Sequence, residues 1–157
     1  MDIKEVVAVL KQKGRVSIQE GNGKVLEFIS LNAWDSQKDD PNGIFLLFET
    51  FQIRTISEQF SEVSLDVVEF ATKPTIYHTI AGRMLQNGPR QNGQVKFSLI
   101  KSDVWNRLLF SFGQSLILQY ASHKESDFQM AEYFPLLSPN AKEMYLSPDG
   151  DIKIIRA

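Results

Sequence analysis

The chain has 157 residues, of which 43% are hydrophobic and 23% charged, with a formal net charge of −2 and no cysteine. These values are typical of one soluble globular domain, and they exclude a disulfide scaffold, a thiolate metal site, a cysteine nucleophile and a polycation built to hold nucleic acid. The N-terminus lacks the apolar segment of a signal peptide, and no apolar run approaches the roughly 18 residues of a membrane span. We therefore expect one cytoplasmic domain over residues 1–157, with no membrane partner.

The first half of the chain is predicted to open with a helix and to continue with short strands. Residues 2–13 repeat apolar side chains three or four apart, with Asp2 as the N-cap and Gly14 after the last lysine. The other elements predicted here are strands at 15–19 and 25–31 around the turn EGNGK, a polar loop at 35–43, a buried strand at 44–49 and a helix from about Thr55 to Phe70.

The second half alternates strands with a single clear helix. The helix is SDVWNRLLFSFG, with Ser102 as its cap and Gly113 as its stop. The other elements predicted here are strands at 75–80, 95–100, 115–121 and 151–156, and a loop rich in Gly, Asn and Gln at 84–94. Strands and helices that alternate irregularly predict an α/β domain with a twisted, mixed β-sheet flanked by helices.

Charge is unevenly distributed along the chain. No acid occurs between Glu69 and Asp103, whereas the stretch from Glu49 to Glu69 carries several acids and a single base, Arg54. Besides Lys73, the basic residues of the acid-free stretch are Arg83, Arg90, Lys96 and Lys101. Such asymmetry is typical of a surface for an anionic ligand, and the alternative is a set of scattered, solvated side chains.

The short motifs do not amount to catalytic machinery. EGNGK lacks the spacing of a phosphate-binding loop, and its Asn-Gly favours a hairpin turn. His78 and His123 are isolated and make neither a metal site nor a catalytic triad. Trp34 and Trp105 are interpreted as packing residues. We therefore assign no catalytic residue, no metal and no cofactor.

Three stretches of the chain, taken in order, carry a resemblance to a known family. A helix that leads into a strand is predicted for DIKEVVAVLKQKGRVSI, and a strand is predicted for KPTIYHTI. A strand, a helix and a second strand are predicted for GQVKFSLIKSDVWNRLLFSFGQSLILQYAS, and the chain ends with DGDIKIIRA. In this order they resemble the YrdC-like family, the threonylcarbamoyl-AMP synthases. The match covers nearly the whole chain in pattern but in few identical residues, and it implies the family's twisted α/β fold.

Enzymes of this family make threonylcarbamoyl-adenylate from threonine, bicarbonate and ATP for a tRNA modification. The resemblance implies a site made of a P-T-D-T loop after the first strand, basic residues in a K-R…S-K segment, an arginine on the strand after the glycine, and a T-S-A-N loop. Phosphates require cationic and N–H donors, and a small amino acid requires hydroxyl and amide partners.

This chain departs from that pattern at almost every point. IQEGNG replaces P-T-D-T, SQKDDPNG replaces K-R…S-K, Ser98 replaces the arginine, and QYAS replaces T-S-A-N. Lys38 keeps one charge, but Asp39 and Asp40 are expected to repel a triphosphate. The loss of charge-assisted contacts worth about 1.5–3 kcal/mol each would weaken nucleotide binding by orders of magnitude. The candidate binding residues that remain are Lys73, Thr75, Gln119 and Ser122.

The retained core pattern and the eroded motifs predict a non-catalytic, YrdC-like binding or regulatory module. RNA or a nucleotide is the expected ligand, because related domains are associated with RNA binding. The alternative is an enzyme related to the threonylcarbamoyl-AMP synthases that uses Thr75, Gln119 and Ser122 in a re-lined small-molecule pocket. A third hypothesis is a structural subunit that pairs with a protein partner or forms a homo-oligomer.

Overall fold

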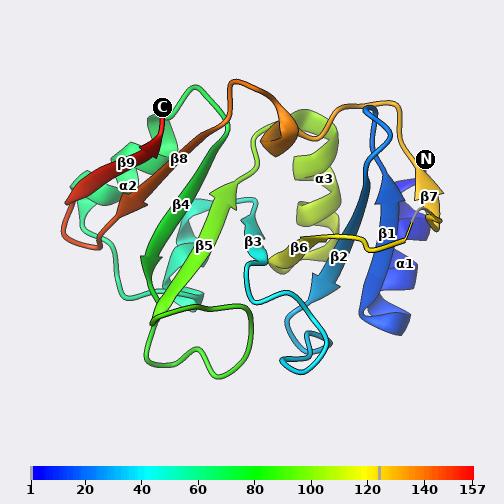
Figure 1. Cartoon of the computed structure of the whole chain (residues 1–157), viewed down its shortest axis with the longest axis horizontal. Helices are drawn as coiled ribbons and strands as arrows, with labels where there is room; N and C mark the ends of the chain where they lie inside the picture. Colours follow the sequence, from blue (N-terminus) through cyan, green and yellow to red (C-terminus); the bar gives the residue numbers. More distant parts are fainter. Residues whose placement is uncertain (1, 124) are drawn as a thin grey trace.

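One mixed β-sheet runs through the whole fold in the computed structural model, which describes residues 2–123 and 125–157 (Figure 1). The elements are α1 (Ile3–Lys13), β1 (Arg15–Gln19), β2 (Val25–Ser30), β3 (Ile44–Leu47), the 3₁₀ helix η1 (Thr50–Thr55), α2 (Glu62–Phe70), β4 (Thr75–Ile80), β5 (Gln94–Leu99), α3 (Asp103–Phe112), β6 (Leu116–Tyr120), β7 (Phe128–Gln129), the 3₁₀ helix η2 (Pro135–Leu137), β8 (Lys142–Leu146) and β9 (Ile152–Arg156). Within these residues no helix is long and apolar enough to span a bilayer.

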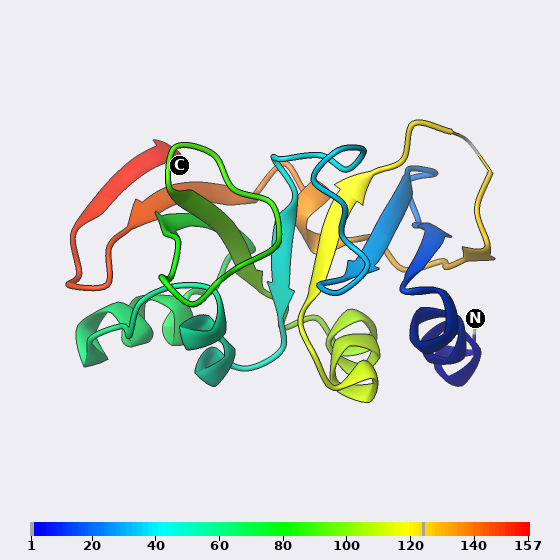
Figure 2. The same ribbon diagram turned by 90° about the horizontal axis from the view of Figure 1, so that it is seen from below.

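The strand order is β7-β1-β2-β6-β3-β5-β4-β8-β9. Three neighbouring pairs are parallel, β1 with β7, β3 with β5 and β4 with β8, and the other pairs are antiparallel. The predicted α/β fold with a mixed sheet is therefore confirmed. Figure 2 shows the three α-helices gathered along one side of the molecule, with the loops that follow β2 and β4 on the other side.

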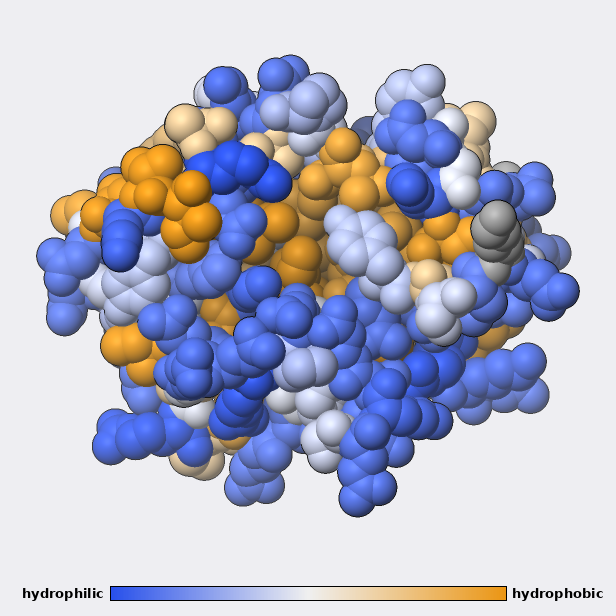
Figure 3. Space-filling model, in the orientation of Figure 1, coloured by the Kyte–Doolittle hydropathy of each residue, from blue (hydrophilic) through white to orange (hydrophobic). Residues whose placement is uncertain are grey.

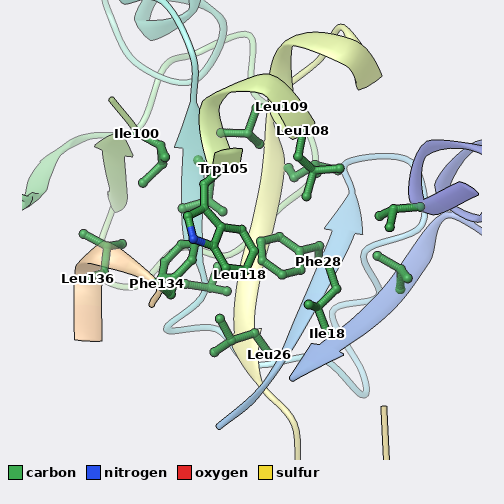
Figure 4. Close-up of a cluster of buried hydrophobic side chains, with 14 of the residues drawn as sticks. Ile18, Leu26, Phe28, Ile100, Trp105, Leu108, Leu109, Leu118, Phe134 and Leu136 are labelled. Carbon is green, nitrogen blue, oxygen red and sulfur yellow. The ribbon is translucent and has the colours of Figure 1, made fainter. Parts of the chain in front are cut away.

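The core lies in two clusters, because successive side chains of a strand point to opposite faces of the sheet. Phe28 belongs to the cluster formed with α1 and α3, and the next residue, Ile29, belongs to the cluster formed with η1 and α2. In the first cluster the Trp105 ring stacks on Phe28 with centroids 5.8 Å apart and meets Phe134 edge-on at 4.9 Å (Figure 4). The Trp105 indole N–H donates to the carbonyl oxygen of Tyr133 at 3.0 Å. Trp105 is thus a packing residue, as predicted.

The helix expected from about Thr55 to Phe70 is wrong in its first half. α2 begins only after Ser61, whose side chain accepts a hydrogen bond from the Ser64 N–H, and the preceding residues form η1 and a loop. Ile56 and Phe60 are buried all the same. Ile56 lies in a turn and Phe60 in a loop, and both side chains pack into the second core cluster. The spacing of the two residues therefore resembles a helical pattern although neither lies in a helix.

Two strands were not expected, β7 and β8. β7 adds two residues beside β1, and β8 lies between β4 and the edge strand β9. The predicted glycine stops of α1 and α3 are confirmed, since Gly14 and Gly113 have left-handed φ angles of 78° and 86°. Asp2 caps α1 through the Lys4 N–H, but Ser102 makes no side-chain hydrogen bond to α3.

Candidate functional site

The four candidate binding residues fall into two pairs, which lie at opposite ends of the central strands. Thr75 begins β4, which is antiparallel to β5, so Thr75 lies level with the C-terminal ends of β5 and β3. Gln119 is near the C-terminal end of β6, which is antiparallel to β3, so Gln119 lies level with the start of β3. Strand spacings of about 4.8 Å and a rise of about 3.3 Å per residue place the two ends on the order of 20 Å apart. The structure therefore does not bring Lys73 and Thr75 together with Gln119 and Ser122.

At the Gln119 end, four polar side chains bind one another. The Arg15 guanidinium donates to both carboxylate oxygens of Asp39, at 3.1 and 2.8 Å. The Gln119 side-chain N–H₂ lies 3.3 Å from Asp39 Oδ1 and 3.3 Å from Glu27 Oε1, and the Asp35 backbone N–H donates to Asp39 Oδ2 at 2.7 Å. We call Arg15, Glu27, Asp39 and Gln119 the Arg15 cluster. The cluster joins Asp39 of the SQKDDPNG segment to Gln119 of the QYAS segment, the two segments that were compared above with K-R…S-K and T-S-A-N.

The charged and polar groups of the Arg15 cluster bind one another. The side chain of Asp39 is only 2% exposed, so this carboxylate turns inward and is paired, and it is not a free charge of the kind expected to repel a triphosphate. Burial alone would raise the pKa of Asp39, but the Arg15 and Asp35 hydrogen bonds and the Arg15 charge hold the pKa below its ordinary value. Over the cluster, Lys38, Tyr120 and Ser122 line a shallow hollow of about 350 Å³. The Arg15 charge is already compensated, so this hollow is a poor phosphate site.

Two residues of the predicted basic surface meet in one pocket. Arg90 and Lys96 line a pocket of about 250 Å³, together with Pro41, His78, Pro89, Gln91, Asn92 and Gln94. Among the described residues that line it there is no carboxylate. We call it the Arg90–Lys96 pocket. One Arg90 nitrogen, Nη2, donates to the carbonyl oxygens of Leu85 and Asn87, at 2.7 and 3.5 Å, which fixes the guanidinium on its own loop and leaves its other N–H donors available.

The other two residues of the predicted basic surface lie elsewhere. Lys101 follows the end of β5, whereas Lys96 is near its start, and the Lys101 ammonium donates to the carbonyl oxygens of Glu69 and Ala71 at 2.6 and 2.8 Å. Arg83 is 90% exposed and pairs with Glu58 at 3.5 Å. The four basic residues therefore do not form one continuous surface.

At the Thr75 end, a second pocket of about 260 Å³ opens between α2, β4, β5 and the start of α3. It is lined by Val68, residues 71–75, Tyr77, residues 98–102 and Pro135. We call it the Tyr77 pocket. Ser98, which stands where the resembling enzymes have arginine, is buried and donates to the Thr75 carbonyl oxygen at 2.7 Å. Ser98 thus joins β5 to β4 and holds no charge for a ligand.

One ionisable pair on β4 and β8 was missed by the sequence analysis. His78 Nε2 contacts Glu143 Oε2, because the parallel pairing of β4 with β8 sets the two residues on the same face. His78 also lines the Arg90–Lys96 pocket. Among the described residues no cluster of His, Cys, Asp and Glu could hold a metal ion.

The face of the molecule in Figure 3 is hollowed between the β4–β5 and the β1–β2 halves of the sheet, and the floor of the hollow is apolar. Tyr120 of the QYAS segment is 55% exposed. Partial burial raises the pKa of Tyr120, against the opposing influence of the Arg156 charge. The QYAS segment thus presents a neutral phenol at this end of β6, while Gln119 is bound within the Arg15 cluster.

The fold is shared with solved structures, although the sequence matches no protein-family model and no curated protein. The crystal structure of E. coli YciO superposes with a TM-score of 0.71 over 98% of this chain and 87% of that chain, at 11% identity. The solution structure of the MTH1692 protein from Methanobacterium thermoautotrophicum gives a TM-score of 0.63 over 100% of this chain and 86% of that chain, at 12% identity. These similarities support a YrdC-like fold, and identities this low show the fold alone.

Proposed function

We propose that this chain of YrdC-like fold is a non-catalytic binding module, and that it takes the phosphate group of a nucleotide in the Arg90–Lys96 pocket. The observation that carries the proposal is that two cations, Arg90 and Lys96, line one pocket with no carboxylate among its described lining residues, whereas the Arg15 charge is neutralised by Asp39.

The hydrogen bonds of the Arg15 cluster support the proposed lack of catalysis. Gln119 accepts a hydrogen bond from the Asp40 N–H at 2.9 Å and donates toward Glu27 and Asp39, so its amide is committed to the protein. A threonine substrate would have to displace these bonds, and each hydrogen bond to a charged group that is broken costs about 1.5–3 kcal/mol. The retained alanine of QYAS offers no polar side chain to replace them.

A nucleotide suits the Arg90–Lys96 pocket better than a length of RNA. The pocket of about 250 Å³ is polar and has room for a phosphate with part of a ribose. RNA held by its backbone needs several cations along one track, and Lys101 and Arg83 are each engaged elsewhere. The expected pairing is one phosphate between the Lys96 ammonium and the free edge of the Arg90 guanidinium.

Isothermal titration of AMP and ATP into the full chain tests the site. Lys96→Met removes one phosphate contact and should weaken binding by about tenfold or more, because a charge-assisted hydrogen bond is worth about 1.5–3 kcal/mol. Arg83→Gln is the matched control, since it removes one positive charge from the adjacent exposed loop without touching the pocket. Equal losses in the two variants would show a general charge effect and reject the site.

A turnover assay tests the claim that the module is not an enzyme. Pyrophosphate release from ATP, measured with threonine and bicarbonate present, should stay at the rate seen without protein. Threonine-dependent release would overturn the proposal and favour the enzyme with a re-lined pocket. A single-stranded RNA that binds more tightly than AMP, with a steep dependence on salt, would instead favour RNA as the ligand.

A further inference from the structure

Asparagine followed by glycine occurs four times in this chain, at 22–23, 42–43, 87–88 and 92–93. Such a pair is chemically labile, because the backbone nitrogen of the glycine can attack the side-chain carbonyl carbon of the asparagine. Glycine has no Cβ that would hinder this approach. The fold decides which pair reacts, since the attack needs a glycine nitrogen and an asparagine side chain that are both free of other bonds.

In two of the four pairs the fold engages the nitrogen of the glycine. The Gly23 N–H donates to the carbonyl oxygen of Glu20 at 2.8 Å. The Gly43 N–H donates to the carbonyl oxygen of Asp40 at 3.1 Å, and Gly43 is buried. Each of these nitrogens must leave its acceptor before it can attack, so both pairs are protected.

In the third pair the fold engages the side chain of the asparagine. The Asn87 amide nitrogen, Nδ2, donates to the carbonyl oxygens of Leu31 and Trp34, at 2.9 and 3.1 Å. The following glycine, Gly88, is buried. The Asn87 side chain is therefore fixed between two backbone acceptors and is not available for the reaction.

The pair at 92–93 has neither kind of protection. Asn92 and Gly93 are exposed, and among the described residues neither the Asn92 side chain nor the Gly93 N–H has a hydrogen-bond partner. Both have left-handed φ angles, 54° and 75°, at the tip of a turn that two backbone hydrogen bonds between Gln91 and Gln94 close, at 3.0 and 2.9 Å.

The tip of this turn has room to move. The Gly93 carbonyl oxygen accepts from the Ala81 N–H at 2.8 Å, but a Cβ at Gly93 would have no atom beyond its chain neighbours within 4 Å. Opening an exposed turn with few buried contacts costs little free energy. The Gly93 nitrogen can therefore reach the Asn92 side chain without displacing any packed group.

We propose that Asn92 is a site of spontaneous deamidation, and that the product closes the Arg90–Lys96 pocket to phosphate; the second part rests on the proposed nucleotide site. The Gly93 nitrogen gives its proton to a base in solution and bonds to Asn92 Cγ, while the side-chain nitrogen takes up a proton and leaves as ammonia. Water then opens the cyclic imide at either of its carbonyl groups, which gives aspartate or isoaspartate at position 92. Water is the only co-reactant, and nothing is oxidised or reduced.

Either product places a carboxylate at a residue that lines the pocket with Arg90 and Lys96. The Asn92 amide is neutral, whereas a carboxylate attracts the two cations that would bind a phosphate and repels the phosphate itself. We expect the affinity for AMP to fall by about tenfold or more in the modified chain.

Mass spectrometry of the full chain, incubated in mildly alkaline buffer and then digested with trypsin, tests the modification. Trypsin cuts after arginine and lysine, so Asn87 and Asn92 fall in separate peptides, residues 84–90 and 91–96. Deamidation should be at least about tenfold faster at Asn92, because the Asn87 amide must first leave two hydrogen bonds. Equal rates in the folded chain overturn the proposal. A difference that persists in urea also overturns it, because the cause would then be the local sequence and not the fold.

Isothermal titration of AMP separates the two parts of the proposal. Asn92→Asp introduces the carboxylate directly and should weaken AMP binding by about tenfold or more. Asn140→Asp is the matched control, because it adds the same charge at an exposed position that does not line the pocket. Unchanged affinity in Asn92→Asp, or equal losses in the two variants, overturns the effect on the pocket. No AMP binding by the unmodified chain refutes the nucleotide site and this effect together, while the peptide rates still decide whether Asn92 deamidates.

Discussion

Replacing Asp39 by Asn tests whether the Arg15 cluster is a closed structural unit. The substitution keeps the shape of the side chain but removes the charge that accepts from Arg15, from the Asp35 N–H and from Gln119. One side-chain oxygen becomes an N–H₂ that faces other donors. Breaking a buried ion pair costs about 3–5 kcal/mol, and Arg15 retains 27% exposure and Glu27 at 3.6 Å, so we expect a loss of about 2–3 kcal/mol.

The dependence on pH gives a second signature of the same cluster. Because the pKa of Asp39 is lowered in the folded state, the carboxylate contributes stability at pH values above about 4, the ordinary pKa of an aspartate. That contribution is lost as the pH falls from there through the folded pKa. The stability difference between the native chain and Asp39→Asn should therefore be constant from pH 5 to pH 7 and should shrink below about pH 4.

Urea unfolding followed by tryptophan fluorescence measures both quantities, since the chain contains two tryptophans. Asp40→Asn is the matched control: Asp40 is exposed, and an asparagine there can still accept from the Asn42 N–H as Asp40 does at 2.8 Å. We expect the control to change the free energy of unfolding by less than about 0.5 kcal/mol. If Asp39→Asn and Asp40→Asn cost the same, Asp39 is not held as the structure indicates.

Three further substitutions test the core and the helix ends. Gly14→Ala and Gly113→Ala both force a left-handed φ on alanine, at about 1 kcal/mol or more. A Cβ at Gly14 would also lie 2.5 Å from the Cβ of Ala33, whereas the space at Gly113 is open, so Gly14→Ala should be the more destabilising by about 1–3 kcal/mol. Trp105→Ala should cost about 3–5 kcal/mol by emptying the cluster around Phe28. Urea unfolding checks all three, and equal losses at the two glycines or a loss below about 1 kcal/mol at Trp105 would contradict the packing.

Local patterns were enough to predict most elements of the fold. α1 has a capping aspartate, a periodic apolar face and a left-handed glycine, and all three signals lie within fifteen consecutive residues. The order of strands and helices, read with the resemblance, also led to the twisted mixed sheet. β8 was not predicted because its sequence, KEMYL, is short and half polar. Its place in the sheet depends on pairing with β4, which lies more than sixty residues earlier.

The candidate site was harder to predict, because its contacts join distant segments. The partner of Asp39 is Arg15, 24 positions away, and nothing in DSQKDDPNG distinguishes the inward Asp39 from the exposed Asp40 beside it. His78 and Glu143 are 65 positions apart. The acid-free stretch contains both Arg90 and Lys96, but the sequence does not show which of its basic residues line one pocket. That depends on the antiparallel pairing of β4 with β5.

The position of bound AMP on the fold is the most direct test of the proposed nucleotide site. Amide chemical shifts of the ¹⁵N-labelled chain, recorded during an AMP titration, report that position. We expect the largest saturable changes at residues 89–96 and at His78, around the Arg90–Lys96 pocket. We expect no change at Asp39, which is paired with Arg15. Changes centred on residues 38–40 and 119–122 would contradict it, because AMP would then occupy the position that the Arg15 cluster is said to fill.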